Sequence, residues 1–308
     1  MRLKNKIGFI ADETHHTVRG VLDWIGDEHD VDGIELRKVE GKHVHELSRQ
    51  KLVAIKKMLD NENVDVHAIA SPLGKGWFLD DDGNPNTNEI QKHLAMVEPL
   101  IAAAAILGTD KIRIFGGKRK QDTTSGFEVV LDFFKAVLEK MPASGLALTV
   151  ENEDATFLST LSDVACLYRN LGHDKRIKAL FDPGNYFFAT SIIRALKVLG
   201  KNINDLLELE INMHFNRIAL VHVKNLRPDN TGMKGLTVAL DQGDIDYKRV
   251  LGRLKVLGIE VPYDLEPHRT LTGQLDEHSR HQPGDPGYAN PENVAEDLKT
   301  LENILSQI

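Results

Sequence analysis

The chain has 308 residues, of which 38 are basic and 46 acidic, and a net charge of −8 near neutral pH. Apolar residues make up 41% of it and charged residues 27%, which is typical of a globular protein and excludes disordered, collagen-like and coiled-coil chains. The acidic balance also argues against a non-specific nucleic-acid binder, because such proteins need a basic surface.

Eight short β-like runs recur along the chain, and a helical pattern follows each of them. The predicted strands are Ile7–Ala11, Gly33–Arg37, Val64–Ala70, Lys111–Phe115, Leu146–Glu151, Ile177–Asp182, Ile218–Lys224 and Tyr263–Glu266. The predicted helices are Thr17–Ile25, His45–Asn61, Asn88–Leu107, Gly126–Lys140, Phe157–Asn170, Ser191–Leu199 with Asp205–Ile211, Tyr247–Leu257 and Pro291–Leu305. Eight alternating units favour a closed (β/α)8 TIM barrel of parallel strands over a doubly wound open sheet.

No Gly/Ser/Pro-rich linker divides these units, so we expect a single barrel domain over residues 1–308. The longest apolar stretch, Leu94–Leu107, is too short to cross a bilayer and contains Glu98 and Pro99. It therefore indicates a buried helix, and we expect no membrane contact. The single cysteine, Cys166, cannot form an internal disulfide, which fits a cytoplasmic protein.

Apolar and polar residues alternate within several of the predicted strands. In Ala147–Glu151, Leu148 and Val150 share one face, while Thr149 and Glu151 share the other. A parallel strand covered by helices on both faces should instead be apolar nearly throughout. Polar residues near the C-terminal strand ends fit a barrel mouth, where the catalytic groups of TIM barrels sit.

The last four predicted strands carry residues that can bind a metal at or near their C-terminal ends: Glu151, Asp182, His222 and Glu266. In a closed barrel these ends surround one mouth, so the four side chains should converge. Three carboxylates and one imidazole suit Mn²⁺, Mg²⁺ or Co²⁺ and accept Zn²⁺, and we expect one such ion. Asp264 is an alternative ligand to Glu266, because Pro262 leaves the register of the last strand open.

Six segments resemble the xylose-isomerase-like TIM barrels, which include sugar-phosphate isomerases and epimerases: Gly33–Arg37, Ser71–Lys75, Thr149–Asn152, Phe181–Tyr186, Val221–Lys224 and Asp264–Glu266. The resemblance implies that the four residues bind one divalent metal, and that Glu151 and Glu266 are also the catalytic acid/base pair. Two positions depart from the family pattern, since Asn185 replaces a frequent histidine and Asn225 a common aspartate. An asparagine can bind a hydroxyl but cannot transfer protons, so we expect Asn185 to contact substrate.

Other polar residues are expected near the mouth as substrate contacts: Lys224, Ser71, His67, Arg113 and Arg269. Two alternatives stay open. Arg37 and Arg113 could instead pair with Glu35 inside the barrel, and His67 could be a buried core histidine. Long loops near residues 71–87 and 267–290 are expected to cover the site as lids.

Proton removal next to a carbonyl is the chemistry that this residue set favours. We expect a divalent-metal-dependent isomerase or epimerase of a small sugar or polyhydroxy carbonyl compound, acting through an enediolate. A metal-dependent dehydratase of a keto-inositol or dehydroshikimate-like substrate shares the first step and is the main alternative. An AP-endonuclease-type nuclease would need further metal ligands, and a non-catalytic sugar-binding barrel would not need all four. We expect no nucleic-acid partner, and leave association into a homo-oligomer open.

Overall fold

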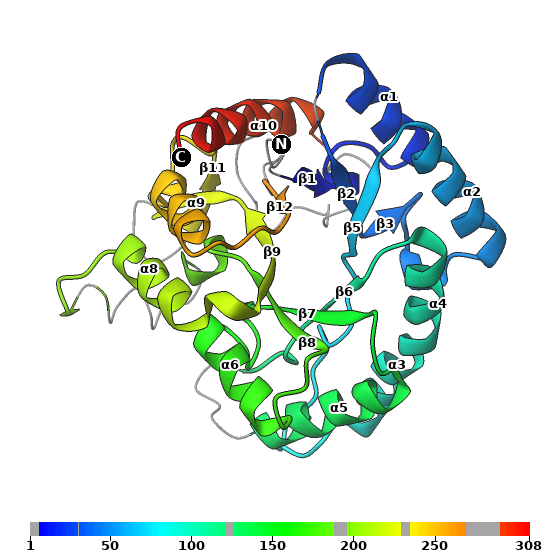
Figure 1. Cartoon of the computed structure of the whole chain (residues 1–308). Helices are drawn as coiled ribbons and strands as arrows, with labels where there is room; N and C mark the ends of the chain where they lie inside the picture. The colour runs from blue at the N-terminus through cyan, green and yellow to red at the C-terminus, as the bar shows by residue number, and fades with distance from the viewer. Residues whose placement is uncertain are drawn as a thin grey trace.

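The structure, a computed structural model, describes residues 6–29, 31–120, 126–187, 196, 198–228, 235–268 and 290–308. Eight parallel strands close into a barrel in the order β1, β12, β9, β8, β7, β6, β5 and β2 (Figure 1). They are β1 (Ile7–Ile10), β2 (Gly33–Leu36), β5 (Asp65–Ile69), β6 (Lys111–Ile114), β7 (Ala147–Glu151), β8 (Ile177–Phe181), β9 (Ile218–Val223) and β12 (Tyr263–Leu265). The predicted TIM barrel is confirmed, and each predicted strand supplies one barrel strand.

Helices surround the barrel as an outer ring (Figure 1). They are α1 (Val18–Glu28), α2 (Arg49–Asn61), α3 (Thr87–Ala95), α4 (Val97–Leu107), α5 (Phe127–Lys140), α6 (Leu161–Asn170), α8 (Ile203–His214), α9 (Tyr247–Val256) and α10 (Pro291–Ser306). Most of the helix predicted at Ser191–Leu199 lies outside the described residues.

Two helices begin about one turn later than the hydrophobic pattern predicts, because a capping side chain sets the first turn. The pattern predicts a start at His45, yet the Ser48 hydroxyl accepts a hydrogen bond from a backbone amide of the first turn, and α2 begins after it. The pattern also predicts a start at Phe157, whereas Thr160 caps α6 in the same way.

The helix predicted over Asn88–Leu107 is divided at Met96 into α3 and α4. The division places Pro99 in the first turn of α4, where its missing amide proton costs no helical hydrogen bond. By length and composition alone, Thr87–Leu107 is apolar enough to cross a membrane. In the structure α4 instead packs against β5 and β6 as part of the outer ring.

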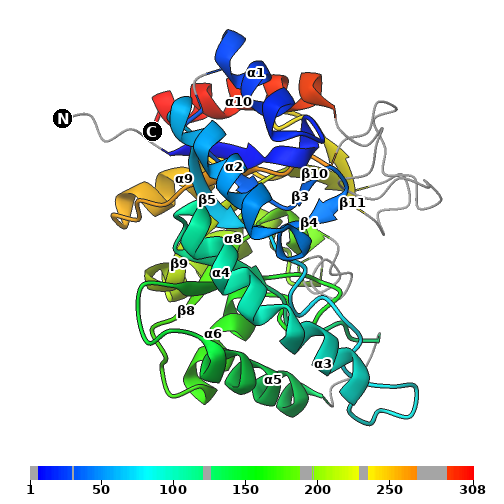
Figure 2. The same ribbon diagram turned by 90° about the vertical axis from the view of Figure 1, so that its right-hand side faces the viewer.

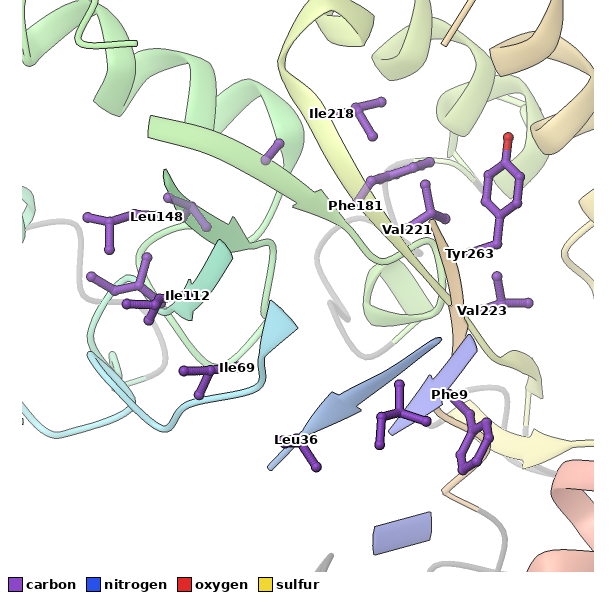
Figure 3. Packing of buried hydrophobic residues seen from close by; sticks show 14 of the residues in the cluster. Phe9, Leu36, Ile69, Ile112, Leu148, Phe181, Ile218, Val221, Val223 and Tyr263 are labelled. Atoms are coloured by element: carbon purple, nitrogen blue, oxygen red, sulfur yellow. The ribbon is translucent and has the colours of Figure 1, made fainter. Parts of the chain in front are cut away.

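The outward faces of the strands form the main hydrophobic core with the helices. Figure 3 shows part of this layer, including Leu148, Phe181 and Val221 from neighbouring strands. Inside the barrel, Ala68, Leu180 and Leu220 form a separate small apolar cluster. Leu180 and Leu220 come two residues before Asp182 and His222, so the apolar layer lies beneath polar residues on the same strand faces.

Two short hairpins that the sequence does not predict follow barrel strands at their C-terminal ends. They are β3–β4 (Lys38–Val39 and Lys42–His43) and β10–β11 (Asn225–Pro228 and Gly235–Val238). Figure 2 shows both hairpins toward the end of the barrel to which β1 points. Pro262 lies just before β12 rather than within it, which removes the uncertainty about the register of that strand.

Candidate active site

Four side chains converge at the C-terminal end of the barrel, as the sequence predicts. Glu151 ends β7, Asp182 and Glu266 directly follow β8 and β12, and His222 lies in β9. One ligand atom from each residue lies within 4.8 Å of the others, and all four side chains are buried. Asp264, the alternative ligand, does not belong to this group.

A cavity of about 490 Å³ lies above these residues. It is lined by Arg37, Lys38, His43, Pro72, Lys75, Arg113, Glu151, Glu153, Asp154, Asn185, Lys224, Glu266 and His268. Most of these side chains are charged, so the cavity suits a polar ligand rather than an apolar one.

The donor atoms of the cluster fit a divalent cation. His222 Nδ1 is buried and has no hydrogen-bond partner among the described residues. His222 Nδ1 lies 3.3 Å from Glu266 Oε2, 3.6 Å from Asp182 Oδ2 and 3.8 Å from Glu151 Oε1. Three carboxylates so close together need positive charge, and the cluster could hold a divalent metal.

Two cationic side chains bridge the same carboxylates. Lys224 Nζ lies 2.7 Å from Asp182 Oδ2 and 3.0 Å from Glu266 Oε2. Arg113 Nη1 lies 3.2 Å from Glu151 Oε2 and 3.6 Å from Glu266 Oε1. Both side chains line the cavity, where the sequence places candidate substrate contacts, and both are already paired with the carboxylates of the cluster.

The two glutamates have opposite electrostatic environments. Burial raises the pKa of Glu151, although Arg113 and His222 partly oppose the shift. Burial also acts to raise the pKa of Glu266, but the neighbouring charges of His268, Lys224 and His222 hold it well below its usual range. Glu151 is therefore the more readily protonated of the pair.

Asn185 lies in the site and holds Glu151 in place. Its amide nitrogen donates to Glu151 Oε1 at 3.1 Å and to the backbone oxygen of Asn152 at 2.9 Å. Asn225, by contrast, serves the backbone: its amide donates to the carbonyl oxygens of Leu240 and Ile245. An aspartate could not donate these bonds, which gives a physical reason for the asparagine.

Two other predicted substrate contacts, His67 and Ser71, lie away from the cavity lining. His67 Nδ1 lies 2.7 Å from Asp264 Oδ1 in the barrel interior, and His67 does not line the cavity. The Ser71 hydroxyl donates to the backbone oxygen of Arg113, and Ser71 likewise does not line the cavity. The geometry thus favours structural roles for both residues. Arg269 and the loop over residues 269–289 lie outside the described residues.

A group of ion pairs that the sequence analysis missed joins the first strand to the site. Arg37 Nε lies 3.0 Å from Asp12 Oδ1, and Arg37 Nη2 lies 2.7 Å from Glu13 Oε1. His268 lies 3.3 Å from both Glu13 Oε1 and Glu266 Oε2. Asp12 and Glu13 follow β1. Their position just after a barrel strand is the same signal that pointed to the four candidate metal ligands.

A second missed pair follows β7 at the rim of the cavity. Lys75 Nζ lies 2.9 Å from Glu153 Oε2. Burial, together with the neighbouring Glu153 carboxylate, raises the pKa of Asp154 to about 7. Asp154 therefore offers a carboxyl group that can hold a proton near neutral pH.

Comparison with known proteins identifies the family. The family described as xylose isomerase-like TIM barrel matches residues 26–304. No curated protein sequence matches the chain.

Solved structures with the same fold have very different sequences. The IOLI protein with a bound zinc atom is 13% identical, with 98% of each chain covered and a TM-score of 0.70. The 3-keto-D-glucoside 4-epimerase YcjR from E. coli is 16% identical over 96% of this chain and 100% of its own, with a TM-score of 0.64. Endonuclease IV from Thermus thermophilus is 18% identical over 98% of this chain and 100% of its own, with a TM-score of 0.62. These likenesses show the fold alone, and the match to the family model shows that the chain belongs to the xylose isomerase-like TIM barrel family.

Proposed function

We propose that the protein is a divalent-metal-dependent isomerase or epimerase of a small sugar or polyhydroxy carbonyl compound. The observation that carries this proposal is a group of four buried side chains whose ligand atoms could hold a metal ion, two of them the cavity-lining glutamates Glu151 and Glu266. The proposed ligands are Glu151, Asp182, His222 and Glu266. Mn²⁺, Co²⁺, Mg²⁺ and Zn²⁺ are all compatible with this donor set.

A divalent cation bound there would polarise a substrate carbonyl and stabilise the negative charge of an enediolate. The two glutamates then divide the proton transfers. Glu151, with its raised pKa, takes the proton from the carbon next to the carbonyl, and Asn185 holds the carboxylate in position. In an epimerisation, Glu266 takes a proton from solvent and returns it to the opposite face of that carbon, and Glu151 releases the proton it took.

The cations of the site bind the polar groups of the substrate. Lys224 and Arg113 both line the cavity and present N–H donors next to the carboxylates. Each can donate to a hydroxyl or carbonyl oxygen of a substrate held between the two glutamates. The size of the cavity and the acidic net charge support a small-molecule substrate and no nucleic-acid partner. The lone cysteine supports a cytoplasmic location.

Asp154 favours a second candidate function, dehydration of a substrate such as a keto-inositol. A dehydratase removes the same proton and then expels a hydroxyl group, which needs a proton donor. Asp154 lines the cavity, and its pKa of about 7 leaves a large fraction protonated at neutral pH. Glu153 lies beside it and is paired with Lys75.

The two functions differ in their products. The test incubates metal-loaded protein in D₂O with a panel of ketoses, aldoses and keto-inositols, followed by mass spectrometry and NMR. An isomerase or epimerase incorporates deuterium without loss of water, whereas a dehydratase gives a product lighter by one water. Glu151→Gln should slow either reaction by about 10²- to 10⁴-fold. Turnover that survives complete removal of metal, or in Glu151→Gln at the wild-type rate, would contradict both.

A further inference from the structure

A buried carboxylate lies behind the histidine of the candidate metal site. His222 Nε2 is 2.8 Å from Glu35 Oε1, and both side chains are fully buried. The other ring nitrogen, Nδ1, faces the three carboxylates of the site at 3.3 to 3.8 Å. Each nitrogen of the ring thus faces a different group.

We propose that Glu35 is the positioning residue of His222. By accepting the Nε2 proton, Glu35 fixes the tautomer and the orientation of the ring, so that Nδ1 presents its lone pair to the metal. A carboxylate in this place also makes the imidazole a more basic ligand. The inference rests on the proposed metal site and adds to it a residue that touches neither metal nor substrate.

The alternative partners of Glu35 are engaged elsewhere. Arg37 pairs with Asp12 and Glu13, and Arg113 pairs with Glu151. Among the described residues, the close contact of Glu35 is therefore with the ring of His222, although the two residues are 187 positions apart in the sequence. Because β2 and β9 are not adjacent in the barrel, this contact crosses the barrel interior.

The same interior holds a matched control, the pair of His67 and Asp264. Asp264 is as deeply buried as Glu35 and also contacts a histidine, but its partner is not a proposed ligand. Two glycines make room for the pair, since a Cβ at Gly33 would lie 2.4 Å from His67 Nε2 and one at Gly8 would lie 2.3 Å from Asp264 Oδ1. Asp264→Asn therefore perturbs a buried carboxylate while leaving the contact between Glu35 and the His222 ring in place.

The experiment measures Zn²⁺ affinity by competition with a chelator for wild type, Glu35→Leu, Glu35→Gln and Asp264→Asn. Glu35→Leu should bind about 10- to 100-fold more weakly. Glu35→Gln keeps an acceptor for the Nε2 proton, so it should lose less than Glu35→Leu. Asp264→Asn should stay within about twofold of wild type, because the His222 ring keeps its acceptor.

Proton and ¹⁵N NMR of the zinc-loaded protein supplies a second readout. A protected Nε2 proton on His222, assigned with His222→Gln, should be present in wild type, shifted in Glu35→Gln and lost in Glu35→Leu. The inference is overturned if wild type lacks this proton, if Glu35→Leu binds zinc as tightly as wild type, or if Asp264→Asn weakens binding equally. If Glu35→Leu does not fold, Glu35→Gln and the wild-type signal still decide. A wild-type protein that binds no metal overturns the proposed function as well.

Discussion

The two sides of the cavity hold their glutamates in different ways. On the β7 side, Glu151 receives a hydrogen bond from the neutral amide of Asn185 and has Arg113 as its close cation. On the β12 side, Glu266 lies near Lys224 and His268, with Arg37 slightly farther away. The first environment raises a carboxyl pKa and the second lowers one.

This difference shows how one site can hold two carboxylates for unlike tasks. A carboxylate near few cations takes up a proton readily, whereas one surrounded by cations gives up its proton readily. The sequence alone cannot reveal this, because both residues end strands in the same way. Four substitutions test how the charges around the cavity act on its titratable groups.

Lys224→Met should have the largest effect, because it removes the cation that bridges Asp182 and Glu266. Breaking a buried ion pair costs about 3–5 kcal/mol of unfolding free energy, and added Mn²⁺ or Zn²⁺ should restore much of the loss by replacing the positive charge. Thermal unfolding with and without metal measures both effects. Lys75→Met is the control, since its partly exposed pair with Glu153 should be worth less than about 1 kcal/mol. Equal losses of unfolding free energy in Lys224→Met and Lys75→Met would contradict the role of Lys224 as the buried cation of the site.

Asn185→Ala should disturb Glu151, which ends β7, and leave Glu266 unchanged. A hydrogen bond to a charged group contributes about 1.5–3 kcal/mol, so kcat on the substrate found in the screen should fall by roughly 10- to 100-fold. Asn185→Asp keeps the size of the side chain but cannot donate and places a like charge beside Glu151, so it should be no more active. A fully active Asp variant would show that Asn185 does not hold Glu151.

Asp154 should make the stability of the folded protein depend on pH. Its pKa is about 7 in the folded protein and 3.8 in the unfolded chain, so the folded state holds the proton more tightly. This group therefore makes stability fall as pH rises from about 4 to 7. Unfolding temperatures of wild type and Asp154→Asn across this range should converge at low pH and separate at pH 7, with the variant more stable. A difference in unfolding temperature between wild type and Asp154→Asn that is largest at low pH would contradict the raised pKa of Asp154.

His43, on the β3–β4 hairpin, should make stability change with pH in the opposite direction to Asp154. We expect this effect to be the smallest of the four. Burial, with help from Lys38, lowers the pKa of this imidazole from 6.5 to about 4. The unfolded chain takes up the proton more readily, so this group makes stability rise as pH increases from about 4 to 6.5. His43→Gln should flatten that rise in the same unfolding experiment. An unchanged pH profile would mean that His43 is not held neutral.

The fold and the four converging residues follow from the sequence because both depend on a repeated unit. Each strand has a detectable period, and Glu151, Asp182, His222 and Glu266 each lie at or beside the C-terminal end of one, so the barrel brings them together. The sequence also places Glu35 inside the barrel, but its partner there depends on how strands distant in sequence are arranged. The hairpins and helix starts do not follow from the sequence, because short strands and single capping side chains leave little periodic signal.

Metal analysis of the purified protein is the direct test of the proposed metal site. We predict about one equivalent of Mn, Co, Mg or Zn per chain in wild type, and its loss in His222→Ala, because the imidazole is one of four ligands. Circular dichroism of the variant confirms that the barrel is intact. A protein that takes up none of these ions after incubation with each, or a His222→Ala variant that keeps a full equivalent, would contradict the proposed site.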